Sequence, residues 1–363
     1  MSFLGRLYRG ETRINFIGAR MRWYAASGVI VLICVLSLIF KGFNEGVEFK
    51  GGSSFQIPAS GTSITADEAN TAFTNAGATP GEAPQVVGSG STKQIVVNTA
   101  TLTPAEQNRV VASVAKALGV DPQSISPKTF SSRWGHDTTV KALQGLVIFL
   151  IAVSIYMSLR FQWRMAVGGM IALAHDLIVA AGVYSLAGFE LTPSTIVGLL
   201  TILGFSLYDT VVVYDKVAEN SKDILAGSRM TFSEAANLAV NQTLMRSINT
   251  SLIALLPVAG LLFVGAGLLG VGTIKDLALI LFVGLASGAY SSLFLATPIV
   301  VDLTERTPQY RALTKRVVAK RSSEARKAEE AALTGVTVAP RRASGPAPAP
   351  KVGARPQSRR KRK

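Results

Sequence analysis

The sequence predicts a polytopic α-helical membrane protein with six transmembrane helices and a small α+β, ferredoxin-like domain outside the membrane. Of its 363 residues, 48% are hydrophobic and 16% are charged, which is too apolar for an ordinary soluble domain. The apolar residues gather in six runs near the length of roughly 20 residues that crosses the hydrocarbon core. A polar segment of about 95 residues separates the first run from the second, and this length suffices for a two-layer core.

The first transmembrane helix is predicted at residues 23–41, after a cytoplasmic N-terminus (residues 1–22) that contains five arginines. A basic start before an apolar run could also be a signal peptide. The run from Trp23 to Phe40 is longer than a usual signal-peptide core, however, and no small-residue cleavage pattern follows it. We therefore expect a retained helix. It contains the only cysteine, Cys34, for which we expect packing rather than reactivity.

Residues 42–140 are predicted as an extracytoplasmic domain with the element order β-α-β-β-α-β, the split unit of ferredoxin-like folds. Two capping boxes, Thr65 with Glu68 and Thr103 with Glu106, open its helices, and Gly119 ends the second one. Composition and a hairpin signal around residues 88–91 predict the strands. They lie at about residues 51–57, 84–88, 93–99 and 124–131.

Five further transmembrane helices are predicted between residues 141 and 301, at about 142–159, 165–187, 194–214, 245–267 and 274–301. Lys and Arg residues occur in alternate connections: they lie between the second and third helices and between the fourth and fifth, whereas residues 188–193 and 268–273 contain none. By the positive-inside rule, both termini are predicted in the cytoplasm and residues 42–140 on the outside.

Residues 302–363 form a basic tail with 17 Lys or Arg and 5 Asp or Glu, so the tail carries +12 of the formal net charge of +15. A charged helix is predicted at residues 311–333, and the Pro-, Ala-, Gly- and Arg-rich composition after Thr334 predicts disorder. The tail either orients and solubilises the protein or contacts anionic lipid or ribosomal RNA. The sequence does not separate these two interpretations.

Asp209 is the principal candidate site residue, because it lies inside the fourth apolar run. A carboxylate near the bilayer centre costs about 2.5–3.5 kcal/mol on insertion scales, and such residues mostly face a bundle interior or a proton or ion path. The helical rise places Asp209 and Arg246 both roughly 8 Å from the cytoplasmic edge, on antiparallel neighbouring helices. Arg246 favours an ionised carboxylate and burial favours a neutral one, which suits a group that binds and releases protons. The alternative is a static ion pair between the two helices.

A candidate secondary polar site inside the predicted helices consists of His175, Asp176, Asn249 and Thr250. For His175 and Asp176 we expect a hydrogen-bonded packing role, with participation in a proton path as the alternative. Gly284 and Gly288 form a G-x-x-x-G motif followed by small and polar residues, which predicts close helix packing. Asp215 and its charged neighbours up to Lys222 are expected to form a solvated network at the membrane edge.

No enzyme signature is present. The only histidines are His136 and His175, and the sequence has no Cys/His metal spacing, no Gly-Lys-Ser/Thr phosphate loop and no nucleophile elbow. We therefore expect no cofactor, no metal and no direct ATPase activity. Any energy would come from a gradient or a partner.

Four motifs resemble those of the SecF family, the smaller subunits of the bacterial SecDF export accessory complex. GVEFKGG (residues 46–52), with Gly46, Glu48, Gly51 and Gly52, is similar to the family motif after the first helix. ALAHD (172–176), GFSLYDTVVVYDKVAEN (204–220) and TLMRSINTS (243–251) are similar to the motifs of the third, fourth and fifth helices. The resemblance covers about residues 10–305.

The resemblance implies a half-transporter of the resistance-nodulation-division (RND) type that pairs with SecD in the bacterial cytoplasmic membrane. The proton-conducting residues of the family fall on Asp209 and Arg246, together with an Asp from SecD. In the family, proton movement drives motion of external domains and promotes late steps of preprotein translocation. The implied partners are SecD, the SecYEG translocon, YajC, YidC and translocating preproteins.

Two residues depart from the family pattern. Glu48 stands where the family usually has Asp, which is a mild change for a loop acid. Tyr208 replaces the usual Asn beside Asp209 and removes an amide that could hydrogen-bond the carboxylate.

Two other functions are alternatives to proton-coupled export. The first is a structural scaffold that stabilises SecD and the translocon without conducting protons. The second is an RND exporter of small molecules, although such exporters usually have a doubled chain and much larger external domains. Copurification with a SecD-like partner would discriminate best among them.

Overall fold

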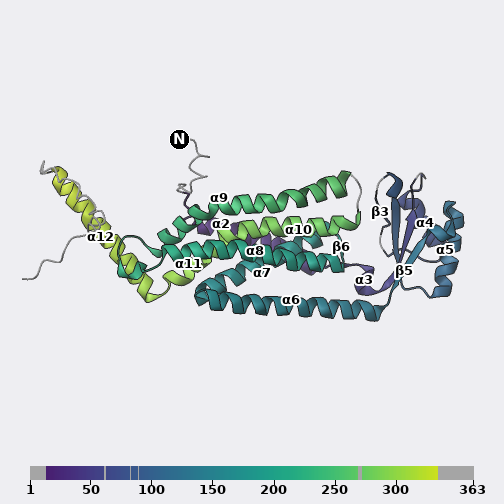
Figure 1. The fold of residues 1–363 in the computed structure, drawn as a ribbon, viewed down its shortest axis with the longest axis horizontal. Helices are drawn as coiled ribbons and strands as arrows, with labels where there is room; N and C mark the ends of the chain where they lie inside the picture. Colours follow the sequence, from purple (N-terminus) through teal and green to yellow (C-terminus); the bar gives the residue numbers. More distant parts are fainter. Residues whose placement is uncertain (1–13, 61–62, 82, 89, 269–271, 334–363) are drawn as a thin grey trace, which may run out of the picture. The chain divides into compact units, whose positions relative to one another are not determined.

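The computed structural model describes residues 14–60, 63–81, 83–88, 90–268 and 272–333. The chain divides into two compact units, with the boundary after Thr314. The first unit contains a bundle of long helices and an α/β domain (Figure 1).

Six helices of the described residues are long and apolar enough to cross a membrane, as the sequence predicts. In chain order they are α2 (Arg20–Phe40), α6 (Ser132–Arg160), α7 (Trp163–Ala187), α8 (Pro193–Asn220), α9 (Phe232–Ala259) with its π-helical continuation η4 (Gly260–Leu268), and α10 (Gly272–Ser291) continued by the π-helical turn η5 (Ser292–Ala296) and α11 (Thr297–Glu305).

Two of these helices begin well before the predicted apolar runs. α6 begins at Ser132 instead of near residue 142, because the Ser131 hydroxyl accepts a hydrogen bond from Trp134 N at 3.2 Å and caps a polar first part. α9 begins at Phe232 instead of near residue 245, behind a capping box of Thr231 and Glu234. Residue 140, the predicted end of the external domain, therefore lies inside α6. Hydropathy detects only the apolar part of a helix and misses such capped polar extensions.

The π-helical turn η5 follows from Pro298. Proline lacks an N–H donor and its ring clashes with the carbonyl four residues earlier, here that of Phe294. The regular hydrogen-bond ladder is therefore interrupted within Ser292–Ala296, and the last membrane helix widens by a π turn at this point.

The α/β domain has the predicted ferredoxin-like element order. Its elements are β2 (Gly52–Pro58), α4 (Ala66–Asn75), β3 (Gln85–Val87), β4 (Gln94–Thr99), α5 (Pro104–Leu118) and β5 (Ser126–Phe130). The four strands lie in the order β3-β4-β2-β5 and all pairs are antiparallel. Phe55, Ile57, Ile95 and Val97 of the sheet are fully buried and pack with Phe73 of α4 in one apolar core.

Both predicted capping boxes of this domain are confirmed. The Thr65 hydroxyl accepts from Glu68 N, and the Glu68 carboxylate accepts from Thr65 N at 2.8 Å. Thr103 and Glu106 exchange the same pair of bonds at the start of α5. Gly119 ends α5 with φ +67°, the left-handed conformation that glycine adopts without strain.

The stretch after α2 is more ordered than predicted. β1 (Asn44–Glu45) pairs in parallel with β6 (Glu190–Leu191), which lies in the connection between α7 and α8. A short helix, α3 (Val47–Lys50), then leads into β2. Gly51 follows α3 with φ +79°, and a Cβ at Gly52 would lie 2.6 Å from the Thr99 carbonyl oxygen. The glycine pair of the GVEFKGG motif is therefore required by a turn and a close strand approach.

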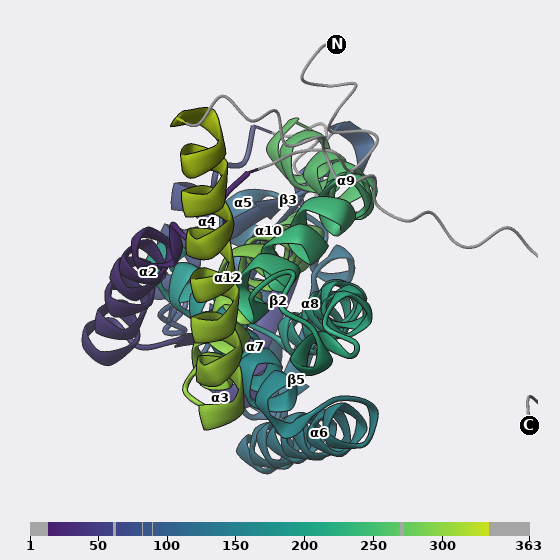
Figure 2. The ribbon, with the colours of Figure 1, turned by 90° about the vertical axis from the view of Figure 1, so that its left-hand side faces the viewer.

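α7 is the central helix of the bundle. It contacts α2, α6, α8 and α10, and Figure 2, which looks along the helices, shows it among them. In the apolar window of α7, 61% of the residues are buried, against 17% for α2 and 11% for α6. Residues on α7 therefore have neighbours on most sides, which suits it to hold buried polar groups.

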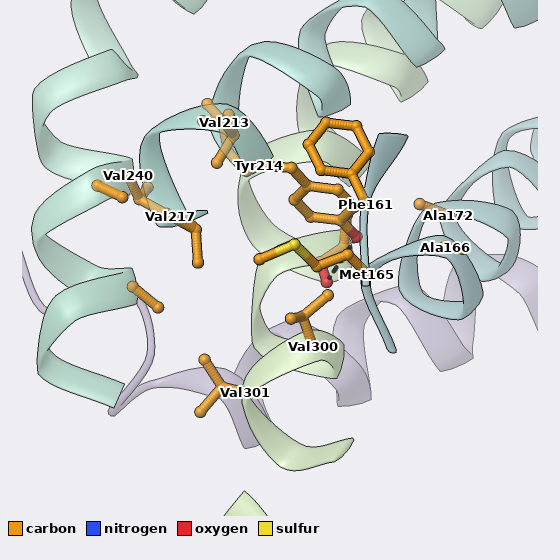
Figure 3. Close-up of a cluster of buried hydrophobic side chains, with 14 of the residues drawn as sticks. Phe161, Met165, Ala166, Ala172, Val213, Tyr214, Val217, Val240, Val300 and Val301 are labelled. Atoms are coloured by element: carbon orange, nitrogen blue, oxygen red, sulfur yellow. Dashed lines mark hydrogen bonds between the residues drawn. The ribbon is translucent and has the colours of Figure 1, made fainter. Parts of the chain in front are cut away.

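Tyr214 packs the C-terminal part of α8 against its neighbours in the bundle. Its ring is fully buried and meets the ring of Phe161 edge-on, with 5.8 Å between centroids. Its hydroxyl donates to the Ala296 carbonyl oxygen at 3.3 Å. Figure 3 shows it beside Met165 and Val300, so α7, α8 and α11 meet around one aromatic side chain.

The predicted charged helix of the tail is confirmed as α12 (Pro308–Leu333), which begins three residues earlier than expected. Residues 334–363, for which the composition predicts disorder, lie outside the described residues.

The capping box of α5 generates a pH prediction. Hydrogen bonds from Thr103 hold the pKa of the Glu106 carboxyl below its ordinary value of about 4.3. A depressed folded-state pKa contributes stability above the unfolded pKa, and this contribution is lost as the pH falls through the folded pKa. We expect Glu106→Gln, which keeps a capping side chain, to abolish this acid-dependent loss. Unfolding of the α/β domain in the full chain at a series of acidic pH values checks it, and identical pH profiles for the two proteins would contradict it.

Candidate functional site

Asp209 lies on α8 with its side chain turned into the bundle. The residue is only 6% exposed. The Ser251 hydroxyl of α9 donates to its Oδ2 at 3.4 Å. Asp209 also lines a cavity of about 20 Å³ with Ser206, Thr250, Ser251 and Gly288 among others, and this volume is close to what a single water needs. The carboxylate is thus buried, weakly hydrogen-bonded and next to a small space.

Arg246 does not form an ion pair with Asp209 among the described residues. Its Nη2 donates instead to the Tyr208 hydroxyl at 3.3 Å. Neighbouring residues of a helix point about 100° apart, so Tyr208 is 49% exposed while Asp209 is buried. The static Asp209–Arg246 ion pair, which was the alternative interpretation of the sequence, is therefore absent here. Tyr208, one of the two departures from the family pattern, binds the Arg246 guanidinium, and Asp209 does not.

Asp176 of α7 is a densely hydrogen-bonded carboxylate in the interior of the bundle. Its Oδ1 accepts from Ser287 Oγ at 2.7 Å and from His175 Nδ1 at 3.1 Å. Its Oδ2 accepts from Ser206 Oγ at 2.5 Å and from Ser291 Oγ at 2.7 Å. A carboxylate has about four acceptor positions, so all of them are occupied. Four such bonds compensate the burial of a charge that is 1% exposed.

The predicted secondary polar site divides into two parts. His175 and Asp176 lie in the buried cluster, in the hydrogen-bonded arrangement expected of a packing role. Asn249 is exposed on α9, and the half-buried Thr250 donates its hydroxyl to the Arg246 carbonyl oxygen at 2.8 Å. Among the residues that the structure describes, neither Asn249 nor Thr250 is hydrogen-bonded to Asp176, and Thr250 lines the Asp209 cavity instead.

Sequence reasoning missed the serines that complete both carboxylate sites. Ser287 and Ser291 belong to the small and polar run that was interpreted only as a packing surface. Ser206 precedes Asp209 by one helical turn, and Ser251 ends the TLMRSINTS motif. A signal existed only for Ser206, because it lies three residues from Asp209 and faces the same side of α8. The other three serines donate to carboxylates of other helices, which sequence spacing does not reveal.

Gly284 and Gly288 allow α10 to lie close against α8. A Cβ at Gly284 would come within 2.8 Å of Ile202 Cβ, and a Cβ at Gly288 would lie 2.9 Å from Ser206 Cβ. The glycines are spaced by four residues and face the same side of α10. This close approach brings Ser287 and Ser291 of α10 within reach of Asp176.

The remaining predicted residues lie away from the two carboxylates. Gly46, Glu48, Gly51 and Gly52 belong to the β1–α3–β2 stretch, and none of them lines the Asp209 cavity. At the end of α8, Asp215 accepts from Arg160 Nη2 at 2.6 Å. Both side chains are about half exposed, so this pair contributes at most about 1 kcal/mol.

One face of α8 and α9 exposes apolar side chains at the level of these polar residues. Phe205, Leu252, Ile253 and Leu256 are 48–72% exposed, and none of the apolar window of α9 is buried. Arg246 lies on this face. A guanidinium on an apolar membrane-level surface is costly unless another group covers it. Because Arg246 needs such cover, this surface is suited to contact with another protein.

Comparisons with known proteins agree with this architecture. Residues 110–306 match the family model "Protein export membrane protein SecD/SecF, C-terminal", and residues 36–63 match the "SecD/SecF GG Motif". The chain is 45% identical to the protein translocase subunit SecF of Streptomyces coelicolor, over 91% of this chain and 88% of that protein. It is 42% identical to SecF of Mycobacterium tuberculosis, over 98% and 86%.

A solved structure matches the fold. The crystal structure of SecDF, a translocon-associated membrane protein from Thermus thermophilus, aligns with a TM-score of 0.70 and 29% identity, over 82% of this chain and 39% of that one. A second SecDF structure, in a super-membrane-facing form, aligns with a TM-score of 0.58.

The fold and the site define a multi-pass membrane protein of the protein-transport class. The chain belongs to the SecD/SecF family of protein export membrane proteins, and the relatives that match nearly its whole length are SecF subunits. The resemblance seen in the four motifs is thereby confirmed.

Gly284 and Gly204 form a matched pair of substitution sites. We expect Gly284→Ala to destabilise the bundle by about 1–3 kcal/mol, because its new Cβ would overlap Ile202. Gly204→Ala on α8 has no atom within 4 Å of its new Cβ and should be neutral or stabilising by up to about 1 kcal/mol. Thermal unfolding of the purified protein in detergent measures both. Equal melting temperatures for the two variants would show that the close approach of α10 and α8 is unimportant.

Proposed function

We propose that this chain pairs with SecD and uses the proton motive force to promote late steps of preprotein translocation through SecYEG. The observation that carries the proposal is Asp209, a buried carboxylate with one long hydrogen bond beside a cavity of about one water. A carboxylate in this setting is suited to gain and lose a proton. The role is that of a transport subunit, with no covalent chemistry of its own.

SecD is the partner that best completes this site. The Thermus thermophilus relative is a SecDF protein, and this chain corresponds to 39% of its length. In that relative both names belong to a single chain. In this protein, a separate SecD subunit would cover the exposed face of α8 and α9. Its contact would remove the Arg246 guanidinium from lipid and could supply a second acid to the Asp209–Arg246 region.

The proposed cellular setting is the bacterial cytoplasmic membrane, with both termini in the cytoplasm and the α/β domain outside. The distribution of Lys and Arg between the helices supports this orientation. The Thermus SecDF structure is described as translocon-associated, which supports SecYEG as a partner here. YajC, YidC and translocating preproteins are further partners within this proposal, and the basic residues of α12 suit anionic lipid.

A scaffold role is the second candidate, and two observations favour it. Arg246 binds Tyr208 and not Asp209. In addition, hydrogen bonds from α8 and α10 to Asp176 of α7 connect the three helices in the interior of the bundle. A scaffold would stabilise SecD and the translocon through these contacts without moving protons.

Asp209→Asn separates the two functions. The amide keeps the size of the side chain but cannot carry a proton, so we expect copurification with SecD to persist and gradient-dependent stimulation of export to disappear. Export of a preprotein into inverted membrane vesicles, with and without a proton gradient, measures the effect. Full stimulation in the variant would favour the scaffold.

Cysteine labelling tests the proposed orientation. In a Cys34→Ala background, Lys116→Cys in α5 and Lys222→Cys after α8 each place a single thiol at an exposed position. We expect a membrane-impermeant maleimide to label position 116 from outside intact spheroplasts and position 222 only in inverted vesicles. The reverse pattern would overturn the orientation, and each variant is the accessibility control for the other.

A further inference from the structure

His175 has a buried nitrogen that the packing of the bundle leaves unused. The residue is 6% exposed, and its Nδ1 is held by Asp176 Oδ1 at 3.1 Å. Its Nε2 has no hydrogen-bond partner in the described part of the chain. Because the carboxylate accepts, Nδ1 carries the hydrogen, and Nε2 of the neutral ring presents a lone pair. A buried acceptor without a partner carries a cost, which a packing role alone does not explain.

Asp176 is arranged to stabilise a positive charge on this ring. All of its acceptor positions are filled, so adding a proton to the carboxylate would turn an acceptor into a donor and force one of its partners to give up its donor role, for example by rotation of a serine hydroxyl. Adding the proton to His175 Nε2 breaks none of these bonds. It also converts the His175–Asp176 contact into a charge-assisted hydrogen bond, which is about twice as strong as a neutral one. The geometry therefore favours the imidazole as the group that binds an extra proton.

Other titratable groups in the described part of the chain lie on the helices that pack against α7. From α10 the Tyr290 ring lies 6.1 Å away, with its hydroxyl bonded to Ser27 Oγ at 3.0 Å. From α2, the buried Cys34 thiol contacts the Val179 carbonyl oxygen. From α8, Asp209 lies beyond Ser206. Asp176 is thus the charged partner in direct contact with the ring.

Ser206 connects this pair to the candidate site. It donates its hydroxyl to Asp176 Oδ2 at 2.5 Å, and it lines the same cavity as Asp209, one turn away on α8. A change in the charge of the His175–Asp176 pair alters how strongly Asp176 attracts this hydroxyl. Ser206 then transmits the change to the wall of the Asp209 cavity.

We propose that His175 and Asp176 form a second proton-binding site of the transmembrane bundle, coupled to Asp209 through Ser206. The proton comes from water: it leaves a hydronium and bonds to the lone pair of His175 Nε2, while Nδ1–H and the Asp176 carboxylate stay as they are. The pair thereby gains one positive charge and its net charge becomes zero. The coupling rests on the proton-dependent function proposed for Asp209, but proton binding by His175 is measurable without it.

Nitrogen-15 NMR of the histidine rings tests the proposal directly. The chain contains only two histidines, His136 and His175, so His136→Gln at an exposed position of α6 leaves His175 as the single signal. We expect the full-length protein in lipid nanodiscs to show a neutral ring protonated at Nδ1 at the basic end of the pH range over which the protein stays folded, and a doubly protonated ring at its acidic end. A neutral ring over the whole range would overturn the proposal.

In Asp176→Asn, the doubly protonated signal of His175 should be lost over the same range. Its persistence would show that the Asp176 carboxylate does not stabilise the charge on the ring.

His175→Asn tests whether the site matters for export. Its amide can replace the Nδ1–H donor to Asp176 but cannot bind a proton, so a purely structural role would survive. We expect SecD copurification to persist and the gradient-dependent stimulation to be lost, with His136→Gln as the matched control at full stimulation. Full stimulation in His175→Asn would overturn the coupling. If Asp209→Asn also retained full stimulation, the proposed function itself would fail, while the NMR result would still decide whether His175 binds a proton.

Discussion

The burial of the Asp176 carboxylate is the constraint on which the rest of the bundle depends. A charge in the membrane interior must be compensated by the protein, since no bulk water reaches it. Here four donors from three helices converge on the two oxygens of one side chain. Such a cluster forms only if α8 and α10 come close to α7. Gly284 and Gly288 permit α10 to lie close to α8, because their missing side chains leave room for Ile202 and Ser206.

The two membrane carboxylates have opposite environments. Asp176 is saturated with donors in the centre of the bundle, whereas Asp209 has one long bond from Ser251 and a small cavity at its side. A saturated carboxylate holds its neighbours in place, and a weakly bonded one can change its protonation with little rearrangement. Ser206 connects the two carboxylates: its hydroxyl donates to Asp176, and its side chain lines the cavity beside Asp209.

The outer face of α8 and α9 indicates that the bundle is one part of a larger assembly. Its apolar side chains and Arg246 would be poorly matched to lipid together. The SecDF relative is a much longer chain, of which this protein matches 39%. Tyr208 binds the Arg246 guanidinium in the isolated chain, so an incoming partner would compete with this contact or build on it.

The sequence by itself determined the six membrane helices, the ferredoxin-like element order, both capping boxes and the position of Asp209 inside a membrane helix. These features depend on local composition, on helical and strand periodicity, and on motifs within a few residues, all of which a single chain displays directly. The early starts of α6 and α9 were missed, because a polar helical turn outside the membrane has no hydropathy signal.

Only the tertiary structure decided which polar groups meet. The depth of Asp209 and Arg246 could be estimated from helical rise, but their rotation about the helix axes depends on packing against other helices. That rotation turns Asp209 inward and Arg246 outward. The four donors to Asp176 lie up to 115 residues from it in the sequence, and their convergence depends on close packing of α10 on α8. The G-x-x-x-G motif predicts that α10 packs closely, but it does not identify the helix that α10 meets.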